Sequence, residues 1–241
     1  GFTTVDALAQ QFRVTPQTIR RDINRLCEDG TLRRLHGGVA PPVEKGNLDY
    51  SKRQLINLEA KKRIATAVAE RITDHASIAF SVGTTPELVA RALGAHSHLR
   101  VFTNNMNVAF TCCDNASFEV TLPGGRLRNR DRDILGQAAV ELFAAYKVDF
   151  GVFGVGGVDG DGTLLDFYEG EVAARQTILK NCRAAYLVLD ASKFGRPAHV
   201  RGGHISEMTT VFCDRPPPDY IRQLLDEAGV ELVTCDGGGL R

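Results

Sequence analysis

Short apolar runs alternate with helical patterns over most of the chain, and this alternation restricts the fold more than any other feature of the sequence. Strands that alternate with helices are typical of an α/β domain with a largely parallel sheet. We therefore predict such a domain over residues 73–241. Its expected strands are 78–82, 100–102, 118–122, 148–155, 185–189, 210–212 and 231–234.

Glycines and hydroxyl, amide or basic side chains follow several of the predicted strands. Ligands of parallel α/β sheets bind at the carboxyl ends of the strands. The loop that begins at residue 83 also opens a helix, and backbone N–H groups and hydroxyls there suit an anion. A capped turn explains any one of these loops, but several loops at one sheet edge indicate a small phosphorylated ligand. The predicted contacts are Gly83, Thr84, Thr85, Thr103, Asn104, Gly125, Arg126 and Lys193.

The first forty residues predict a different module. Apolar residues at 5, 8, 9 and 12 lie on one face of a helix, and Thr3 or Thr4 can cap its start. A second helix begins at Thr15 and Pro16, and Gly30 ends it. The following residues alternate and end in two glycines, as in a small β-wing. Two short helices and a wing describe a winged helix-turn-helix.

Polar and basic residues lie on the outer face of the second predicted helix. The formal net charge of the chain is zero, so any attraction to nucleic acid has to be local. Gln and Arg bind base edges, and Arg and Thr bind phosphates, although a solvated helix face is the alternative. The predicted DNA contacts are Thr15, Gln17, Thr18, Arg20, Arg21 and Arg25, with Arg34 and His36 in the wing.

Two prolines at residues 41 and 42 separate the modules. We therefore place a DNA-binding domain at 1–42, a linker and connecting helix at 43–72, and the ligand-binding domain at 73–241. The connecting helix is predicted from apolar residues between Leu55 and Ile72, and it can also support a dimer.

The six cysteines predict neither disulfides nor a zinc site. None forms C-x-x-C, and no histidine follows at the spacing of a zinc ligand. No apolar run reaches the roughly 20 residues that cross a bilayer, and no signal peptide opens the chain. We therefore expect a cytoplasmic protein with reduced thiols and with no membrane partner, metal or cofactor.

Several runs resemble the DeoR family of bacterial repressors. In the N-terminal module they are VTPQTIRRDI at 14–23 and LHGGV at 35–39. The resemblance extends over nearly the whole chain. It implies a sensor domain with the ribose-5-phosphate isomerase fold and a homo-oligomer that represses genes of glycerol metabolism. The implied effector, which releases the operator DNA, is glycerol 3-phosphate or another small phosphorylated polyol or sugar. Further runs that carry the resemblance are 82–87, 103–109, 124–128, 149–151, 192–196 and 214–218.

The chain departs from the family pattern at three places. Ser81 stands where an acidic residue is usual, and Arg175 stands where lysine is common, which keeps the charge but changes its geometry. Family members also carry a helix before the position of Gly1, so we expect an N-terminally truncated DNA-binding domain without its first helix. The apolar residues expected to be partly uncovered are Leu8, Phe12, Ile19 and Ile23.

Two other functions fit the sequence. One is a repressor of the same family that responds to another sugar phosphate, because the pocket residues decide the effector. The other is an enzyme similar to a sugar-phosphate isomerase, which needs a positioned general base. Residues 154–157 read GVGG where an acidic cluster is expected in such an isomerase, so we assign no catalytic residue.

Overall fold

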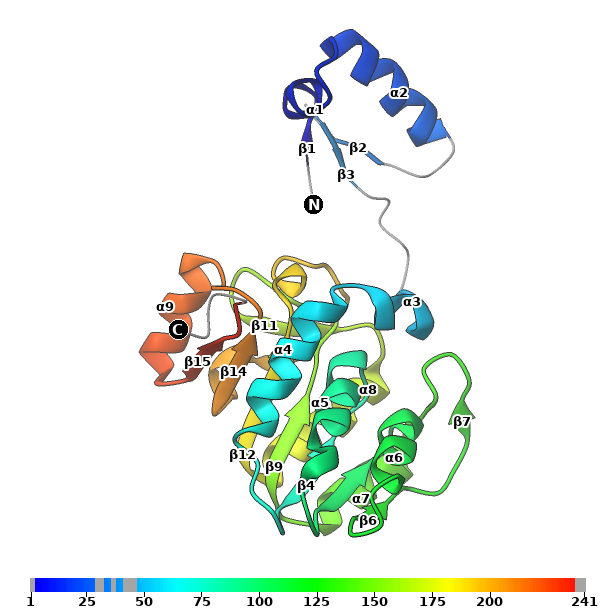
Figure 1. Cartoon of the computed structure of the whole chain (residues 1–241), viewed down its shortest axis with the longest axis vertical. Coiled ribbons are helices and arrows are strands. Elements are labelled where there is room, and N and C mark those ends of the chain that lie inside the picture. Colours follow the sequence, from blue (N-terminus) through cyan, green and yellow to red (C-terminus); the bar gives the residue numbers. More distant parts are fainter. Residues whose placement is uncertain (1–2, 29–32, 36–37, 41–46, 237–241) are drawn as a thin grey trace. The chain divides into compact units, whose positions relative to one another are not determined.

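The structure is a computed structural model that describes residues 3–28, 33–35, 38–40 and 47–236. The chain forms two compact units, Gly1–Asn47 and Leu48–Arg241, which we call unit 1 and unit 2 (Figure 1). Each unit has its own buried apolar core. None of the helices in the described parts is long and apolar enough to cross a membrane.

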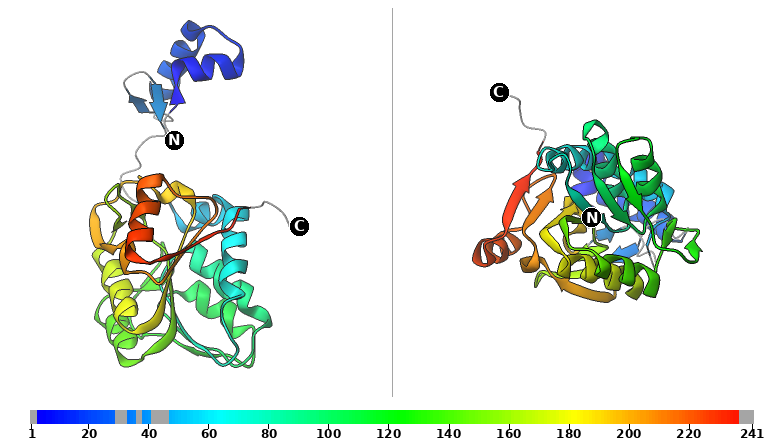
Figure 2. Two further views of the ribbon diagram at one scale, coloured as in Figure 1. Left: turned by 90° about the vertical axis from the view of Figure 1, so that its left-hand side faces the viewer. Right: turned by 90° about the horizontal axis from the view of Figure 1, so that it is seen from below.

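The described residues of unit 1 form two helices and a three-stranded antiparallel sheet (Figure 1, Figure 2). The strand order in the sheet is β1–β3–β2, so the β2–β3 pair forms the hairpin of the predicted wing. The predicted winged helix-turn-helix is thereby confirmed. The elements are β1 (Thr3–Thr4), α1 (Val5–Phe12), α2 (Pro16–Glu28), β2 (Arg33–Leu35) and β3 (Gly38–Ala40).

Local hydrogen bonds explain where the two helices of unit 1 begin. The backbone N–H of Ala7 donates to Thr4 Oγ1 over 3.1 Å, so Thr4 caps α1. The N–H of Thr18 donates to Thr15 Oγ1 over 3.3 Å at the start of α2. Between the helices, Arg13 adopts a left-handed conformation with φ of 53°, which turns the chain sharply.

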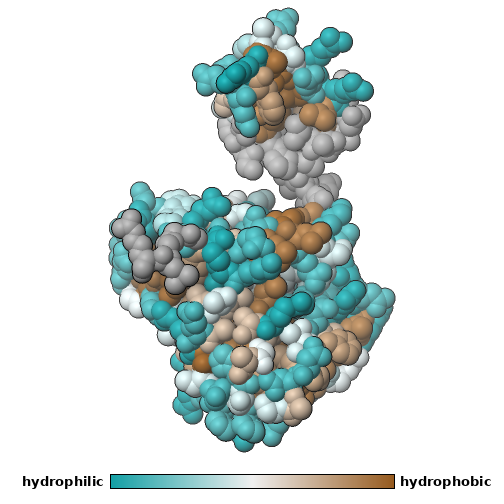
Figure 3. Space-filling model, viewed as in Figure 1, coloured by the Kyte–Doolittle hydropathy of each residue, from teal (hydrophilic) through white to brown (hydrophobic). Residues whose placement is uncertain are grey.

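Four side chains form the buried core of unit 1 among the described residues. They are Ala9, Ile19, Ile23 and Val39, and the partly buried Leu8 packs against them. The expectation that Ile19 and Ile23 are left partly uncovered was therefore wrong, because α1 and β3 cover them. Phe12 is 62% exposed, as expected. Figure 3 shows hydrophobic residues, in brown, at the surface of unit 1.

A seven-stranded parallel sheet forms the centre of unit 2. All seven strands expected from the sequence are present, which confirms the predicted α/β domain. The strand order is β15–β14–β12–β9–β4–β5–β6. The strands are β4 (Ser77–Phe80), β5 (Arg100–Thr103), β6 (Glu119–Thr121), β9 (Val148–Phe153), β12 (Cys182–Leu189), β14 (Thr210–Cys213) and β15 (Glu231–Thr234).

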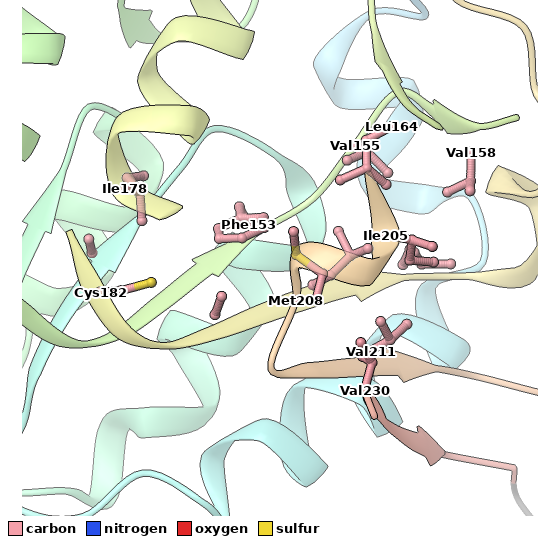
Figure 4. Packing of buried hydrophobic residues seen from close by; sticks show 14 of the residues in the cluster. Phe153, Val155, Val158, Leu164, Ile178, Cys182, Ile205, Met208, Val211 and Val230 are labelled. Carbon is pink, nitrogen blue, oxygen red and sulfur yellow. The ribbon is translucent and has the colours of Figure 1, made fainter. Parts of the chain in front are cut away.

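Helices cover both faces of this sheet. Helices α4, α5 and α6 pack on one face, and α4 and α5 lie in front of the sheet in Figure 1. Helices α7, α8 and α9 pack on the other face, where Figure 4 shows Phe153, Ile178 and Met208 in one apolar cluster. The helices are α4 (Leu58–Ala69), α5 (Thr84–Ala92), α6 (Met106–Cys113), α7 (Gln137–Ala145), α8 (Glu169–Lys180) and α9 (Asp219–Ala228).

Helix α4 lies within the segment expected to connect the domains, and it packs into the core of unit 2. Ile64, Ala65 and Val68 form one buried stripe on α4. They share a cluster with Ile78 and Phe80 of β4, whose alternate side chains face the same side of the sheet. Helix α4 is preceded by the short helix α3, Tyr50–Leu55.

Smaller elements complete unit 2. An antiparallel sheet has the order β10–β11–β13, in which β10 and β11 follow β9 and β13 follows β12, and the β7–β8 hairpin follows β6. In the described part of unit 2, three short 3-10 helices lie between larger elements. The elements are β7 (Leu127–Arg128), β8 (Asp133–Ile134), β10 (Gly157–Val158), β11 (Thr163–Asp166), β13 (Val200–His204), η1 (Leu93–Ala95), η2 (Ala191–Lys193) and η3 (Ile205–Glu207).

Candidate functional site

The loops after β4, β9 and β12 lie at one edge of the central sheet, because these strands are parallel neighbours. The loop after β4 leads through Gly83 into α5, with Gly83 at φ of 141°. A Cβ on Gly83 would stand 3.1 Å from Cδ of Pro86, so both space and backbone conformation favour glycine here. The first turn of α5 therefore presents backbone N–H groups and the hydroxyls of Thr84 and Thr85.

Four cationic side chains gather at this edge, and we call them the cation cluster: Arg53, Lys61, Lys193 and Arg196. Lys61, on α4, is only 3% exposed. Its ammonium group donates to Thr84 Oγ1 over 3.1 Å and to the carbonyl of Arg53 over 2.5 Å. Arg196 donates from Nη1 to the carbonyl of Gly156 over 2.9 Å, in the loop after β9.

The cluster carries more positive than negative charge. Desolvation, followed by the charge of Arg196, lowers the pKa of Lys193 to about 7, and Asp190 only partly opposes this. Burial likewise lowers the pKa of Lys61. Neither lysine forms an ion pair with any described residue. A bound phosphate would supply the missing negative charge and accept their hydrogen bonds.

Buried polar atoms without a hydrogen-bond partner lie near this cluster, in the loop after β5 and beside the β7–β8 hairpin. Among the described residues they include Asn104 Oδ1, Asn105 Nδ2 and Asp131 Oδ2. Arg53 forms an ion pair with the other carboxylate oxygen of Asp131, so it joins these atoms to the cation cluster. Buried polar groups normally have partners, and ligand hydroxyls can both donate to and accept from such atoms.

Arginine–carboxylate pairs support the hairpin beside this region. Arg128 donates from Nη2 to Asp133 over 2.6 Å and to Glu171 over 2.5 Å. Burial raises the pKa of Glu171 to about 7, against the effect of Arg128. Arg175, one of the departures from the family pattern, donates to Asp166 over 2.5 Å. Its role in the structure is therefore to hold β11 against α8.

The predicted effector contacts fall into two groups in the structure. Lys193 belongs to the cation cluster, and Thr84 accepts a hydrogen bond from Lys61 of that cluster. Gly83 and Thr85 flank Thr84 in the sequence. By contrast, the hydroxyl of Thr103 donates to the carbonyl of Phe80 over 3.1 Å, and Asn104 Nδ2 donates to the carbonyl of Ile134 over 2.9 Å. These two side chains hold neighbouring segments together. Gly125 and Arg126 are exposed in the loop between β6 and β7.

Sequence reasoning missed several residues of this region. Lys61 stands three and four positions before Ile64 and Ala65, so it lies on the buried face of its helix. A lysine on an apolar stripe is a signal that the sequence contained. Arg196 lies inside one of the runs that carried the family resemblance. The positions of Tyr50 and Arg53 on α3 had no comparable signal.

The outer face of α2 carries the predicted DNA contacts. Gln17, Thr18, Arg20, Arg21 and Arg25 are all exposed, while Ile19 and Ile23 face the core of unit 1. Thr15 is exposed as well, and its hydroxyl caps the helix. The backbone of Arg34 lies in β2, whereas His36 lies outside the described residues. The described arrangement can place basic and amide side chains against a nucleic-acid groove.

Two family models match the chain. The DeoR-like helix-turn-helix domain matches residues 1–44, and the DeoR C terminal sensor domain matches residues 56–215. A ribose-5-phosphate isomerase A from Methanocaldococcus jannaschii is among the similar solved structures. It has a TM-score of 0.43 and 15% identity, covering 57% of this chain and 55% of that one.

Curated relatives match over nearly the full length. The glycerol-3-phosphate regulon repressor of Escherichia coli is 43% identical, with 98% of this chain and 93% of that protein covered. The repressor of the same name from Haemophilus influenzae is 41% identical, with 98% and 92% covered. The transcriptional repressor CsqR of E. coli is 37% identical, with 97% and 89% covered. With both of its units matched by family models and these relatives aligned along its length, the chain belongs to the DeoR family.

Proposed function

We propose that this protein is a DNA-binding transcriptional repressor of genes for glycerol 3-phosphate metabolism, released from its operator when unit 2 binds glycerol 3-phosphate. Membership of the DeoR family and the similarity to glycerol-3-phosphate regulon repressors support this function. The observation in the structure that carries it is the cation cluster beside Thr84, in which two lysines have no ion-pair partner among the described residues. No cofactor is part of the proposal.

In the proposed site, the cation cluster and the first turn of α5 bind the phosphate. Lys61, Lys193 and the hydroxyl of Thr84 are the central contacts, with Gly83 and Thr85 supplying backbone and hydroxyl donors. Asp131 and Asn104 bind the hydroxyls of the polyol through the two oxygens that accept no hydrogen bond from a described residue. The Asp131 oxygen lies 3.5 Å from Arg128 Nη2, so this ion pair holds it in place. Thr103 positions the loop after β5 through its hydrogen bond to the carbonyl of Phe80. Gly125 and Arg126 stay predicted contacts from the exposed loop between β6 and β7.

In the proposed DNA complex, α2 lies in a major groove. Arg20, Arg21 and Arg25 contact phosphates or base edges, and Gln17 and Thr18 contact base edges or the backbone. Arg34 and His36 contact DNA from the wing, and Thr15 lies at the start of α2. We further propose that the protein binds as a homo-oligomer, because dimeric helix-turn-helix proteins use two half-sites. Its place in the cell is the cytoplasm, where operator DNA is found.

The other two candidate functions differ from this one either in which ligand is bound or in whether the ligand is converted. A repressor for a different sugar phosphate would use the same cation cluster with other hydroxyl contacts. An isomerase-like enzyme would convert its ligand. We propose binding without conversion, because Asp166 is paired with Arg175, and Asp133 and Glu171 are paired with Arg128. An isomerase needs a carboxylate that can approach the ligand and accept its proton, and these ion pairs hold the three carboxylates on arginines instead.

Calorimetric titration of the full chain with glycerol 3-phosphate tests the proposal, with fructose 1-phosphate and glycerol as comparisons. We expect saturable binding of glycerol 3-phosphate, weaker binding of fructose 1-phosphate and no binding of glycerol. The titrated samples are then analysed for product. Preference for fructose 1-phosphate would support the second repressor, and conversion of either phosphate would support the enzyme.

Adjacent lysines on α4 provide a matched pair of variants for the same titration. Lys61→Met removes a buried charge from the proposed phosphate site and should weaken binding by at least about tenfold. Lys62→Met removes an exposed charge that pairs only with Glu59 among the described residues, so binding should stay the same. Thermal unfolding of both variants shows whether the fold is retained. Equal affinity of the two folded variants would contradict the proposed site.

A further inference from the structure

Helix α3 is held on unit 2 by polar contacts that converge on buried carboxylates. The hydroxyl of Tyr50 donates to Glu87 Oε2 over 2.6 Å, and Gln54 Nε2 donates to the same oxygen over 3.1 Å. On the same helix, Arg53 pairs with Asp131, which is 2% exposed. Three of the six residues of α3 therefore hold it in place through carboxylates.

Apolar packing contributes little to the position of this helix. Tyr50 is buried, but Leu55 is 75% exposed and Ile56, the residue after the helix, is exposed too. Elements with few buried apolar contacts open at a lower free energy than the core of a domain. A ligand that competes for the polar contacts can therefore move α3 without disturbing the central sheet.

The contacts of α3 are shared with the proposed phosphate site. Arg53 belongs to the cation cluster, and its carbonyl accepts a hydrogen bond from Lys61. Asp131 keeps one oxygen without a hydrogen-bond partner among the described residues. A phosphate beside Lys61 and Lys193 would offer Arg53 several charged oxygens, and a guanidinium group binds two of them at once. Arg53 can therefore pair with Asp131 or with a bound phosphate.

We propose that α3 is the element through which effector occupancy reaches unit 1, with Arg53 leaving Asp131 for the effector's phosphate. The empty site then holds α3 in the docked position, with Arg53 on Asp131, and the occupied site holds it in a second position, with Arg53 on the phosphate. Only residues 41–49 separate the end of β3 from the start of α3, so a change at α3 acts directly on the chain that leads to unit 1. This inference rests on the proposed function of unit 2.

A two-state element of this kind has a distinctive consequence. An effector shifts the equilibrium only by its differential affinity for the two positions of α3. Weakening the docked position therefore has to strengthen effector binding and never weaken it. A residue that merely supports the fold of the pocket would have the opposite effect, because its loss would weaken binding.

Tyr50→Phe in the full chain tests the proposal, because it keeps the ring and removes the hydroxyl that donates to Glu87. Loss of a hydrogen bond to a charged group corresponds to roughly tenfold in an equilibrium constant. We expect the dissociation constant for glycerol 3-phosphate to fall by about that factor. Release of fluorescently labelled operator DNA, followed by anisotropy, should then occur at a correspondingly lower effector concentration. Gln54→Ala should act in the same direction with a smaller effect.

Tyr146→Phe is the matched control, because Tyr146 is exposed at the end of α7 and should leave both measurements unchanged. If the wild-type protein fails to bind glycerol 3-phosphate, the proposed function fails together with this inference. If it binds and releases DNA normally, but Tyr50→Phe leaves effector affinity unchanged or weakens it, the role of α3 is refuted and the proposed function stands.

Discussion

Raising the pH above 7 should weaken effector binding, because it removes a proton from Lys193 in the empty site. The pKa of this lysine is lowered to about 7 by desolvation and by the charge of Arg196, with smaller contributions from Lys61 and Arg53. A bound phosphate dianion replaces lost solvation and offsets the neighbouring cations, so it raises this pKa again. Binding and protonation of Lys193 are therefore linked.

The sign and size of the effect follow from this linkage. Below pH 7 Lys193 is already protonated, and binding takes up no proton at this residue. Above pH 7 each binding event takes up one proton, so the dissociation constant rises by about tenfold per pH unit until the pKa of the bound state is reached. The effector phosphate has its own second pKa near 6, so it is a dianion throughout this range.

Calorimetric titrations between pH 7 and pH 9, in buffers of different ionisation enthalpy, measure both the affinity and the number of protons taken up. Glu171 also has a pKa of about 7, and its negative charge above that pH would oppose anion binding. Glu171→Gln removes this second contribution. Lys193→Arg keeps its charge at all these pH values and should make the affinity much less dependent on pH.

Folding stability changes in the opposite direction, which separates the two effects. Between pH 7 and about 10.5 the unfolded chain binds more protons at Lys193 than the folded chain, so this residue makes the protein more stable as the pH rises. Loss of the proton from Lys193 therefore does not unfold the protein in this range. A loss of effector affinity that is caused by this residue must come from weaker binding to the folded protein. A constant affinity from pH 7 to pH 9, with no proton uptake, would refute the assignment of Lys193 to the phosphate site.

Three substitutions test other parts of the structure. Arg21→Ala should weaken operator binding and reduce the dependence of log K on log salt concentration by about 0.9, whereas an unchanged slope would remove this arginine from the DNA contacts. Gly83→Ala should lower the free energy of unfolding by about 1–3 kcal/mol and weaken effector binding, because Gly83 has a positive φ. Gly94→Ala, at a position with open space around it, should change neither quantity. Denaturant unfolding and calorimetric titration measure the two effects. Phe80→Ala should lower the free energy of unfolding by about 3–5 kcal/mol, and Phe110→Ala, at a residue that is 68% exposed, should change it by less than about 0.5 kcal/mol; equal losses would contradict the assigned core.

The sequence was sufficient to predict the strands of unit 2 and the helix-turn-helix of unit 1, because both depend on local periodicity. It also predicted the loop at Gly83, since a glycine and two threonines at the junction of a strand and a helix form a local pattern. The stripe on α4 predicted a buried face but not its partner, which depends on the packing of the whole unit.

The cation cluster could not be predicted as a set, because its members come from distant segments. Lys61 touches Thr84 in the loop after β4, whereas Lys193 follows β12, so Lys61 and Lys193 meet through the order of the strands in the sheet. That order depends on how the crossover helices pack, and no short segment encodes it. The error about Ile19 and Ile23 has a similar cause. Their cover includes Val39, which belongs to a strand far from them in the sequence.

The unequal cores of the two units have a consequence for the proposed repressor at high temperature. Unit 1 buries four apolar side chains among its described residues, whereas unit 2 has extensive clusters on both faces of its sheet. Small domains bury a smaller fraction of their surface and are less stable, so we expect unit 1 to unfold first on heating. DNA binding would then be lost while unit 2 still bound effector. Heat would thus have the same result as saturating effector, with the controlled genes expressed in both cases.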